Sequence, residues 1–154
     1  MVWGMITAKG MGHLQWIDRI MCSLDYVEIL DKQFLGSLKD LKIRCMGKEG
    51  LIFQQDNNPK HKSKVAQEWF AQRNVKQLPW PPSSPDMNII EHVWDQLDAL
   101  VCAHNPLLTN KEELWVALGE EWKKFPQKAL NNLYESMPHC VAALMMAWGG
   151  ATKY

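Results

Sequence analysis

At 154 residues, the chain has the length of one domain and enough material for a substantial hydrophobic core. Apolar residues make up 47% of it, which excludes a disordered segment, and no apolar run approaches the roughly 18 residues of a membrane span. Lys plus Arg equals Asp plus Glu, at 17 each, so the overall basic surplus common among nucleic-acid-binding domains is missing. A neutral total charge does not exclude a local stripe of basic residues on one face of the protein.

The cysteines and the N-terminal residues indicate the compartment. The four cysteines are scattered without a C-x-x-C pair, which predicts free thiols in a reducing compartment; they are Cys22, Cys45, Cys102 and Cys140. Residues 1–7 lack a basic segment followed by an apolar one, so no secretory signal is expected. We find no internal repeat or interdomain linker, and we expect a single domain over residues 1–154.

The first third of the chain predicts a strand pair and a helix. Residues 2–7 and 13–17 have strand character, and the glycine-containing segment 9–12 between them predicts a turn. A helix is expected over 23–38 with Ser23 as its N-cap. Residues 39–50 are charged, contain glycine and predict a loop. The apolar positions at helical spacing are Tyr26, Val27, Leu30, Phe34 and Leu38.

The middle of the chain predicts a buried strand over 51–55 and a second short strand over 75–78. Between them, Pro59 is expected in the first turn of a helix that extends to about Gln72. The prolines of segment 79–85 remove backbone donors and fix φ, so this segment is expected to be an irregular connector. The apolar face of the intervening helix is predicted to comprise Val65, Ala66, Trp69 and Phe70.

The last third predicts helices, so the fold class is α/β with helices at the C-terminal end. A helical stripe runs from Ile90 to Val101, and Asn105-Pro106 is expected to end that helix. Thr109 or Asn110 can cap the next helix. That helix is expected to bury Leu114, Ala117, Leu118 and Trp122. The final helical region, 127–148, is expected to be interrupted near Pro138, to end at Gly149-Gly150 and to use as apolar positions Leu130, Leu133, Tyr134, Met137, Val141, Leu144, Met145 and Trp148.

Two carboxylates carry the chemistry that the sequence suggests. Asp56 follows the 51–55 strand, and Glu91 lies in the first turn of a helix, with 34 positions between them. Carboxylates at strand and helix ends are ligands for hard divalent cations, so Asp56 and Glu91 form a candidate metal site. Each also has a simpler interpretation. Asp56 can bond its own backbone in a turn, and Glu91 can close a capping box with Asn88.

Three lysines follow Asp56 closely. Lys60, Lys62 and Lys64 could line a phosphate-binding groove, or they could be the solvated start of a helix. His61 and His92 lie beside the two carboxylates, but a lone histidine is more often a structural hydrogen-bonding residue, and neither is given a catalytic role. Trp80 is expected to pack the connector down rather than stack on a base.

The two carboxylate motifs together resemble those of a known family. Gln54-Gln55-Asp56-Asn57-Asn58-Pro59-Lys60-His61 and Ser84-Pro85-Asp86-Met87-Asn88-Ile89-Ile90-Glu91-His92-Val93-Trp94 are similar to the segments that carry the second Asp and the closing Glu of mariner-superfamily (DDE-type) DNA transposases. The 34-residue gap is typical of one branch of that superfamily. Further similar segments are Val2-Trp3-Gly4, Glu120-Glu121-Trp122, Ser136-Met137-Pro138 and Gly149-Gly150-Ala151-Thr152-Lys153-Tyr154.

The resemblance implies a ribonuclease H-like fold and two-metal cleavage and joining of double-stranded DNA in the nucleus, with no membrane partner. It implies catalytic and metal-binding roles for Asp56 and Glu91, with Mg²⁺ or Mn²⁺ as cofactor, and DNA contacts for Lys60, Lys62 and Lys64. The family's first Asp lies on a central strand before the Val-Trp-Gly motif, at which this sequence begins. We therefore expect weak or absent metal binding, inactivity of the chain alone, marginal stability, and a homodimer or strand-donating partner.

Several positions depart from the family pattern, which normally has proline or basic residues there; they are Ile89, Asp98, Ala99, His139, Cys140 and Trp148. Each lost basic residue removes a candidate phosphate contact. The alternative hypothesis is therefore a domesticated, non-catalytic module that binds DNA or another protein.

Overall fold

The computed structural model describes residues 1–43, 51–82, 84–104 and 108–150. Most of the expected loop 39–50, the helix end at Asn105-Pro106 and the last four residues of the C-terminal motif lie outside the described residues. The chain divides into two compact units, which are described separately: unit 1 is Met1–Met5 with Gly12–Ser83, and unit 2 is Ile6–Met11 with Ser84–Tyr154. The expectation of a single domain stays a prediction.

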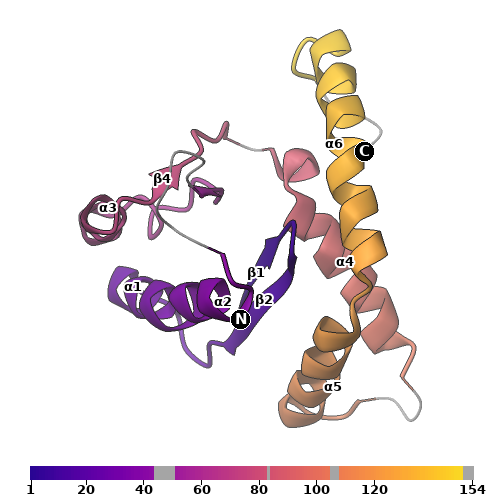
Figure 1. Ribbon diagram of the computed structural model, residues 1–154. Helices are drawn as coiled ribbons and strands as arrows, with labels where there is room; N and C mark the ends of the chain where they lie inside the picture. The colour runs from indigo at the N-terminus through magenta and orange to yellow at the C-terminus, as the bar shows by residue number, and fades with distance from the viewer. Residues whose placement is uncertain (44–50, 83, 105–107, 151–154) are drawn as a thin grey trace. The chain divides into compact units, whose positions relative to one another are not determined.

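The chain begins with a β-hairpin made of β1 (Val2–Thr7) and β2 (Gly10–Trp16), as the sequence predicts (Figure 1). The turn is shorter than expected, because Thr7 closes it: its hydroxyl accepts a hydrogen bond from the Lys9 amide at 3.1 Å and donates to the Gly10 carbonyl at 3.2 Å. Gly10 has φ 137°, a conformation that glycine adopts readily. The residues that follow Gly10 are therefore free to extend the second strand.

The next helix runs without a break through three segments, which are α1 (Ser23–Ile29), the π-helical η1 (Leu30–Phe34) and α2 (Leu35–Asp40). It ends two residues later than predicted. Its N-cap is Cys22 and not Ser23, because the Asp25 carboxylate accepts a hydrogen bond from the Cys22 amide at 2.8 Å. Arg19 also pairs with Asp25, and the pKa of that carboxyl is lowered, first by the Cys22 backbone bond.

The remaining elements of unit 1 are β3 (Ile52–Phe53), α3 (Lys64–Gln72) and β4 (Lys76–Gln77). The two strands are shorter than predicted and pair in parallel. The expected helix start at Pro59 is wrong. The N-cap of α3 is Ser63, whose hydroxyl accepts a hydrogen bond from the Ala66 amide at 3.4 Å, and residues 59–62 form turns before it.

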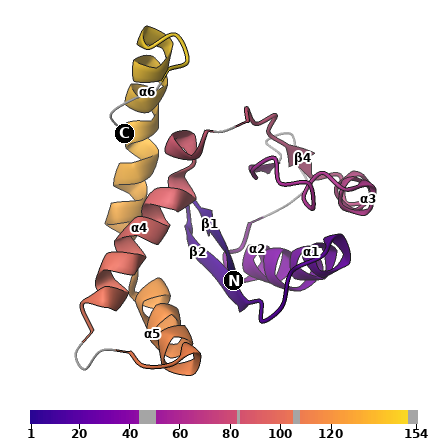
Figure 2. The ribbon, with the colours of Figure 1, turned by 180° about the vertical axis from the view of Figure 1, so that it is seen from behind.

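The core of unit 1 is aromatic and lies between α1, η1, α3 and β3. The Phe34 ring meets Phe53 and Trp69 edge-on, with centroids 5.0 and 5.9 Å apart. Trp69 also donates a hydrogen bond from its indole nitrogen to Asp31 at 2.9 Å, which joins α3 to the first helix. Figure 2 shows α3 near α1, which it contacts. This core holds the end of β3 in place. Its most buried apolar members are Met21, Tyr26, Leu30, Phe34, Leu38, Ala66, Trp69 and Phe70.

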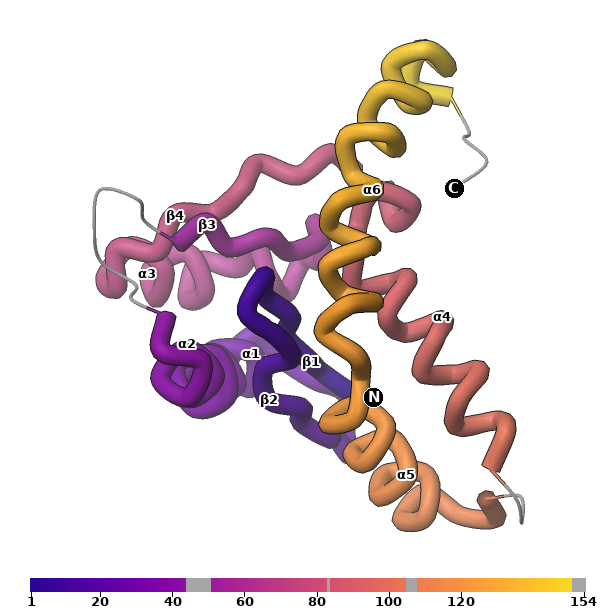
Figure 3. The backbone as a smooth tube through the Cα atoms, turned by 45° about the vertical axis from the view of Figure 1, so that its right-hand side comes forward, coloured from indigo at the N-terminus to yellow at the C-terminus, as the bar shows by residue number. Residues whose placement is uncertain are grey.

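Unit 2 consists mainly of helices, which are the short 3-10 helix η2 (Pro85–Met87), α4 (Ile89–Cys102), α5 (Lys111–Lys124) and α6 (Gln127–Met146). Helix α4 packs against both α5 and α6, and Figure 3 shows α4 and α6 side by side. Trp94 of α4 stacks on Trp122 of α5 with ring centroids 5.2 Å apart. The buried apolar residues of the long helices are Val93, Leu97, Val101, Ala117, Trp122, Leu130 and Cys140.

Several expectations for the last helices are wrong. Leu114 is 46% exposed instead of buried. Helix α6 continues through Pro138, although a proline nitrogen cannot donate a hydrogen bond to the preceding turn. At its end the Trp148 amide bonds the Met145 carbonyl at 3.2 Å, and the Gly149 amide bonds the Leu144 carbonyl at 3.0 Å. This is a Schellman motif, and it places Trp148, with φ 51°, where glycine is usual.

The strands of the described residues form two separate two-stranded sheets, β1–β2 and β3–β4. The hairpin therefore does not pair with β3, the strand that precedes Asp56. The three cysteines among the described residues are free thiols, as predicted, with Cys22 and Cys102 exposed and Cys140 buried. In the described part of the chain, no helix has both the length and the apolar character that crossing a membrane requires.

Candidate functional site

Asp56 lies just after β3, and its two carboxylate oxygens have different surroundings. Oδ1 accepts a hydrogen bond from the Asn58 amide at 3.1 Å, which confirms the turn predicted from the sequence. His61 Nδ1 lies 2.6 Å from the same oxygen. Oδ2 makes no hydrogen bond or ion pair with any described residue, and the side chain is 57% exposed. The carboxylate is therefore anchored through one oxygen and available through the other.

His61 is the residue that sequence reasoning undervalued. Only 15% of its side chain is exposed, and its ring lies on that of Tyr26 with centroids 4.2 Å apart. Burial lowers the pKa of His61, while the Asp56 charge opposes this shift. Because a carboxylate oxygen only accepts, Nδ1 carries the proton of the bond to Asp56. The imidazole thus fixes the direction of the carboxylate, and its position in the Asp-Asn-Asn-Pro-Lys-His segment was the only sequence signal.

The side chains of Gln55 and Gln77 form a hydrogen-bond network next to Asp56 and His61. The Tyr26 hydroxyl donates to Gln55 Oε1, and Gln55 Nε2 donates to Gln77 Oε1 at 3.0 Å and to the His61 carbonyl at 3.5 Å. Burial, and then the negative charge of Asp56, raise the pKa of Tyr26, so this hydroxyl stays protonated as a donor at neutral pH. The network joins the first helix to β4 and to the segment that follows β3, and it was not predicted from the sequence.

The proline-rich connector is tied to the same strand end. Asn57, next to Asp56, donates a hydrogen bond from its side-chain amide to the Trp80 carbonyl at 2.8 Å. Trp80 is half-buried, and the packing of its ring against the connector stays a prediction. The connector is irregular through Pro82, which agrees with its proline content, and Ser83 lies outside the described residues.

Glu91 lies in the first turn of α4, in unit 2, and is exposed. The capping-box interpretation is wrong, because the Asn88 amide bonds the Pro85 carbonyl at 2.9 Å and the N-cap makes no side-chain cap bond. Instead, the side-chain amide of Asn88 donates to Glu91 Oε1 at 3.3 Å. The Glu91 carboxylate therefore stays accessible at the N-terminal end of a helix. His92, next to it, has its Nε2 atom 3.4 Å from the Asp86 carbonyl and does not contact Glu91 there.

Asp56 belongs to unit 1 and Glu91 to unit 2. That their carboxylates come together around a shared metal ion therefore stays a prediction. Among the described residues, no group of three or more His, Cys, Asp or Glu side chains is arranged to hold a metal ion. Each carboxylate, taken by itself, has the accessible oxygen that a hard cation requires.

The lysines near Asp56 do not form a helix face. Lys60 and Lys62 lie in the turns that precede α3, and neither makes an ion pair with a described residue. Lys64 is the first residue of α3, is 90% exposed and reaches Glu68 at 3.9 Å. Two of the three cations thus belong to the same turn segment as Asp56.

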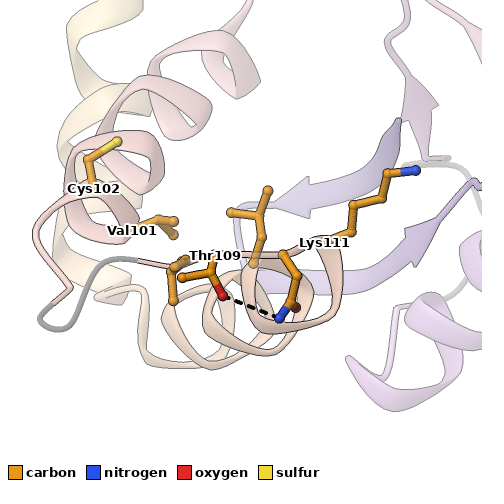
Figure 4. Close-up of a pocket in the computed structure, with 7 residues that line it drawn as sticks. Val101, Cys102, Thr109 and Lys111 are labelled. Carbon is orange, nitrogen blue, oxygen red and sulfur yellow. Dashed lines mark hydrogen bonds between the residues drawn. The ribbon is translucent and has the colours of Figure 1, made fainter.

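A pocket of ≈ 460 Å³ lies elsewhere, where α4 ends and α5 begins (Figure 4). Two of its lining residues, Thr109 and Asn110, lie at the N-terminal cap of α5. The Asn110 side chain accepts a hydrogen bond from the Glu113 amide at 2.8 Å and donates one to the Thr109 hydroxyl at 3.5 Å. This pocket contains none of the predicted site residues. Its lining comprises Val101, Cys102, Leu108, Thr109, Asn110, Lys111 and Leu114.

The mixed helix-and-strand arrangement, the anchored Asp56 after a strand and the accessible Glu91 at a helix start are the features that the two sequence motifs predict. A family model described as DDE superfamily endonuclease matches residues 17–115 of the sequence. Since this match covers more than half of the chain, the chain belongs to that family. The family resemblance inferred from the two motifs is confirmed.

Similar curated proteins are transposases of nematodes. The chain is 37% identical over 154 residues to the transposable element Tc1 transposase of Caenorhabditis elegans, and 34% identical to the Tcb2 transposase of Caenorhabditis briggsae. Both matches cover 100% of this chain and 54% of the relative. The chain therefore spans about half the length of the curated relatives that it matches.

Solved transposase structures share the fold. The structure of the Mos1 transposase catalytic domain with raltegravir and Mn matches with a TM-score of 0.88, covering 99% of this chain and 76% of that one. The Mos1 mariner paired end complex with Mn matches with a TM-score of 0.86, covering 99% and 44%. At 14% identity these likenesses show the fold alone. They confirm the predicted ribonuclease H-like fold with C-terminal helices.

Proposed function

We propose that this chain is part of a transposase catalytic domain that acts on DNA, with Asp56 and Glu91 as metal-binding carboxylates. The observation that carries the proposal is the geometry of Asp56, whose Oδ1 is held by Asn58 and His61 while Oδ2 is available. Support also comes from the family match and from relatives that are themselves transposases. Because the chain spans about half of those relatives, the activity of the whole protein belongs to the proposal.

The proposed cofactor is Mg²⁺ or Mn²⁺. Two Mos1 structures similar to this chain contain Mn and Mg. The residues present fit such an ion, because both candidate ligands are exposed carboxylates and hard divalent cations prefer oxygen donors. When bound, the ions would stabilise the charge that develops on the attacking and leaving oxygens of a phosphodiester.

Residues of this chain would orient the metal-binding carboxylate and bind the DNA backbone. His61 and Asn58 hold the Asp56 carboxylate in one direction, which lowers the entropic cost of presenting it to a cation. Lys60 and Lys62, which make no ion pair with described residues, would contact DNA phosphates beside it. Lys64 would join them, although its partner Glu68 competes for the charge.

The metal site is tested by titrating the chain with Mn²⁺ and measuring free Mn²⁺ by electron paramagnetic resonance. We expect Asp56→Ala to weaken binding by roughly tenfold or more, and His61→Asn to weaken it by roughly tenfold through loss of orientation. Asp18→Ala is the matched control, because Asp18 is also an exposed carboxylate of unit 1. Equal binding by wild type and Asp56→Ala would refute the proposed ligand.

The DNA contacts are tested by measuring affinity for duplex DNA over a series of salt concentrations. Each lysine that contacts a phosphate adds about 0.9 to the slope of log affinity against log salt. Replacing Lys60 and Lys62 together by Ala should therefore reduce that slope by roughly two. Lys128→Ala in α6 is the control and should leave the slope unchanged. A slope that does not respond to the double substitution would place DNA binding elsewhere.

A second candidate function is a non-catalytic module that binds DNA or protein. It is favoured by the sequence positions where proline or basic residues of the family pattern are replaced, since each lost basic residue removes a candidate phosphate contact. We also propose that the 154-residue chain alone cleaves no DNA. A nuclease assay with Mn²⁺ distinguishes the two functions, since cleavage abolished by Glu91→Gln would establish the enzyme. A nuclear location also belongs to the proposal, and imaging a fluorescent fusion would test it.

A further inference from the structure

The segment 56–61, between β3 and α3, is a short loop that closes on itself. The Asn58 carbonyl accepts a hydrogen bond from the His61 amide at 2.9 Å, and the Asn58 side chain accepts one from the Lys60 amide at 3.1 Å. The His61 Nδ1 atom then returns to Asp56 Oδ1 at 2.6 Å. The direction of the Asp56 carboxylate therefore depends on where the protein holds the backbone of His61.

The backbone carbonyl of His61 is held by two glutamine side chains. Gln67 of α3 donates a hydrogen bond to it from Nε2 at 3.2 Å, and Gln55 donates one from Nε2 at 3.5 Å. No backbone amide of the described residues donates to this carbonyl. The shorter of the two bonds comes from α3, whose Trp69 and Phe70 side chains are buried in the core of unit 1. A firmly packed helix thus holds the loop through Gln67.

The orientation of the Gln67 amide is fixed by its partners. A carbonyl oxygen only accepts, so Nε2 of Gln67 must face His61. Oε1 of Gln67 then accepts from Gln77 Nε2 at 3.0 Å, and Gln77 Oε1 accepts from Gln55 Nε2 at 3.0 Å. Gln55 Oε1 in turn accepts from the Tyr26 hydroxyl. Each amide therefore has one orientation, because a flipped amide would place donor against donor.

We propose that Gln67 is a positioning residue for Asp56 and acts through His61. The amide of Gln67 holds the His61 carbonyl, and the imidazole of the same residue orients the carboxylate of Asp56. The inference deepens the proposed function and rests on it, because Asp56 is taken as a metal ligand. It adds a residue that lies outside both sequence motifs.

The variant for the test is Gln67→Met, which keeps the length of the side chain and removes its amide. Gln67 is exposed, so the substitution leaves the core intact. Methionine also brings no charge, so the general attraction between the site and a cation is unchanged. The matched control is Gln72→Met at the last residue of the same helix, where the side chain is exposed and makes no hydrogen bond to a described residue.

The first measurement needs no metal. Long-range ¹⁵N–¹H NMR spectra of the 154-residue chain, recorded at mildly basic pH where the imidazole is neutral, report which ring nitrogen of His61 carries the proton. We expect Nδ1 in wild type and in Gln72→Met. Gln67→Met should shift the ratio of the two tautomers toward Nε2 by roughly two- to tenfold, the equivalent of one ordinary hydrogen bond. An unchanged ratio, or a wild-type His61 protonated mainly at Nε2, would overturn the inference.

The second measurement is Mn²⁺ affinity. Gln67→Met should weaken binding by roughly two- to tenfold, and it should have no further effect in a chain that already carries His61→Asn, because the imidazole through which it acts is gone. Unchanged affinity in Gln67→Met, or an additional loss in the His61→Asn chain, would contradict the positioning role. If Asp56→Ala binds Mn²⁺ as wild type does while the tautomer ratio still shifts, the proposed metal ligand fails and the positioning of the carboxylate stands.

Discussion

The Tyr26 hydroxyl offers a sharp perturbation of the surroundings of Asp56. Tyr26 is 1% exposed, its ring lies on His61, and its hydroxyl donates to Gln55. Tyr26→Phe removes only the hydroxyl and keeps the ring, so it creates no large cavity. The change leaves Gln55 Oε1 without that donor in a half-buried position.

The expected loss follows from that unpaired acceptor. A buried polar group that loses its partner costs about 1–3 kcal/mol, and the partial exposure of Gln55 places the value near 1–2 kcal/mol. For a chain of this length, such a loss lowers the melting temperature by roughly 3–6 °C. Mn²⁺ affinity at Asp56 should change little, because the His61 bond to Asp56 does not involve the hydroxyl.

The pH dependence gives an independent check on the same group. Burial raises the pKa of Tyr26, so the folded state favours the protonated phenol. This contribution to stability is fully present below the unfolded pKa of about 10 and is lost as pH rises above it. Wild type should therefore lose stability between about pH 10 and 11, and Tyr26→Phe should lose less. The difference in stability between the two proteins should shrink over that range.

The assay is urea unfolding followed by far-ultraviolet circular dichroism, with thermal melts as a second measurement. Tyr134→Phe is the matched control, because Tyr134 is 62% exposed, and it should change stability by less than about 0.5 kcal/mol. If Tyr26→Phe is no more destabilising than Tyr134→Phe, or if the difference between wild type and Tyr26→Phe does not depend on pH, the hydroxyl is not the buried donor described above.

Three further substitutions test other parts of the fold by the same unfolding measurement. Gly12→Ala places a Cβ 2.8 Å from the Ser37 hydroxyl, which hydrogen bonds hold in place, and should cost about 1–3 kcal/mol; a neutral effect would show that Ser37 can move. Asn110→Ala removes the acceptor for the Glu113 amide and should cost about 1 kcal/mol, whereas a cost near zero would mean that water caps α5 equally well. Trp148→Gly relieves a positive φ of 51° and should stabilise the dilute chain by about 1 kcal/mol, and a loss would indicate contacts of the indole within the monomer.

The sequence alone predicts most of the elements and the family. Strand alternation, helical spacing and proline positions are local, so they place the hairpin, the long helices and the connector without knowledge of tertiary contacts. The errors in the predicted helix starts occur where two local signals compete. Pro59 suits a first helical turn, yet Ser63 captures the N-cap, because its hydroxyl satisfies a backbone donor of the first turn. Similarly, Asp25 reaches back to the Cys22 amide and moves the cap from Ser23.

The tertiary structure decides what surrounds the residues that the sequence identifies. Asp56 is visible in the motif, but the pairing of one of its oxygens with His61, and the support of that histidine by Tyr26, require the first helix to pack against the end of β3. The period of α6 likewise marks apolar positions without saying which of them find a neighbour, so Tyr134 and Trp148 look like core residues and are exposed. The physical reason is the same in both cases: a local pattern fixes the direction of a side chain relative to its own element, whereas burial and hydrogen-bond partners depend on segments distant in the chain.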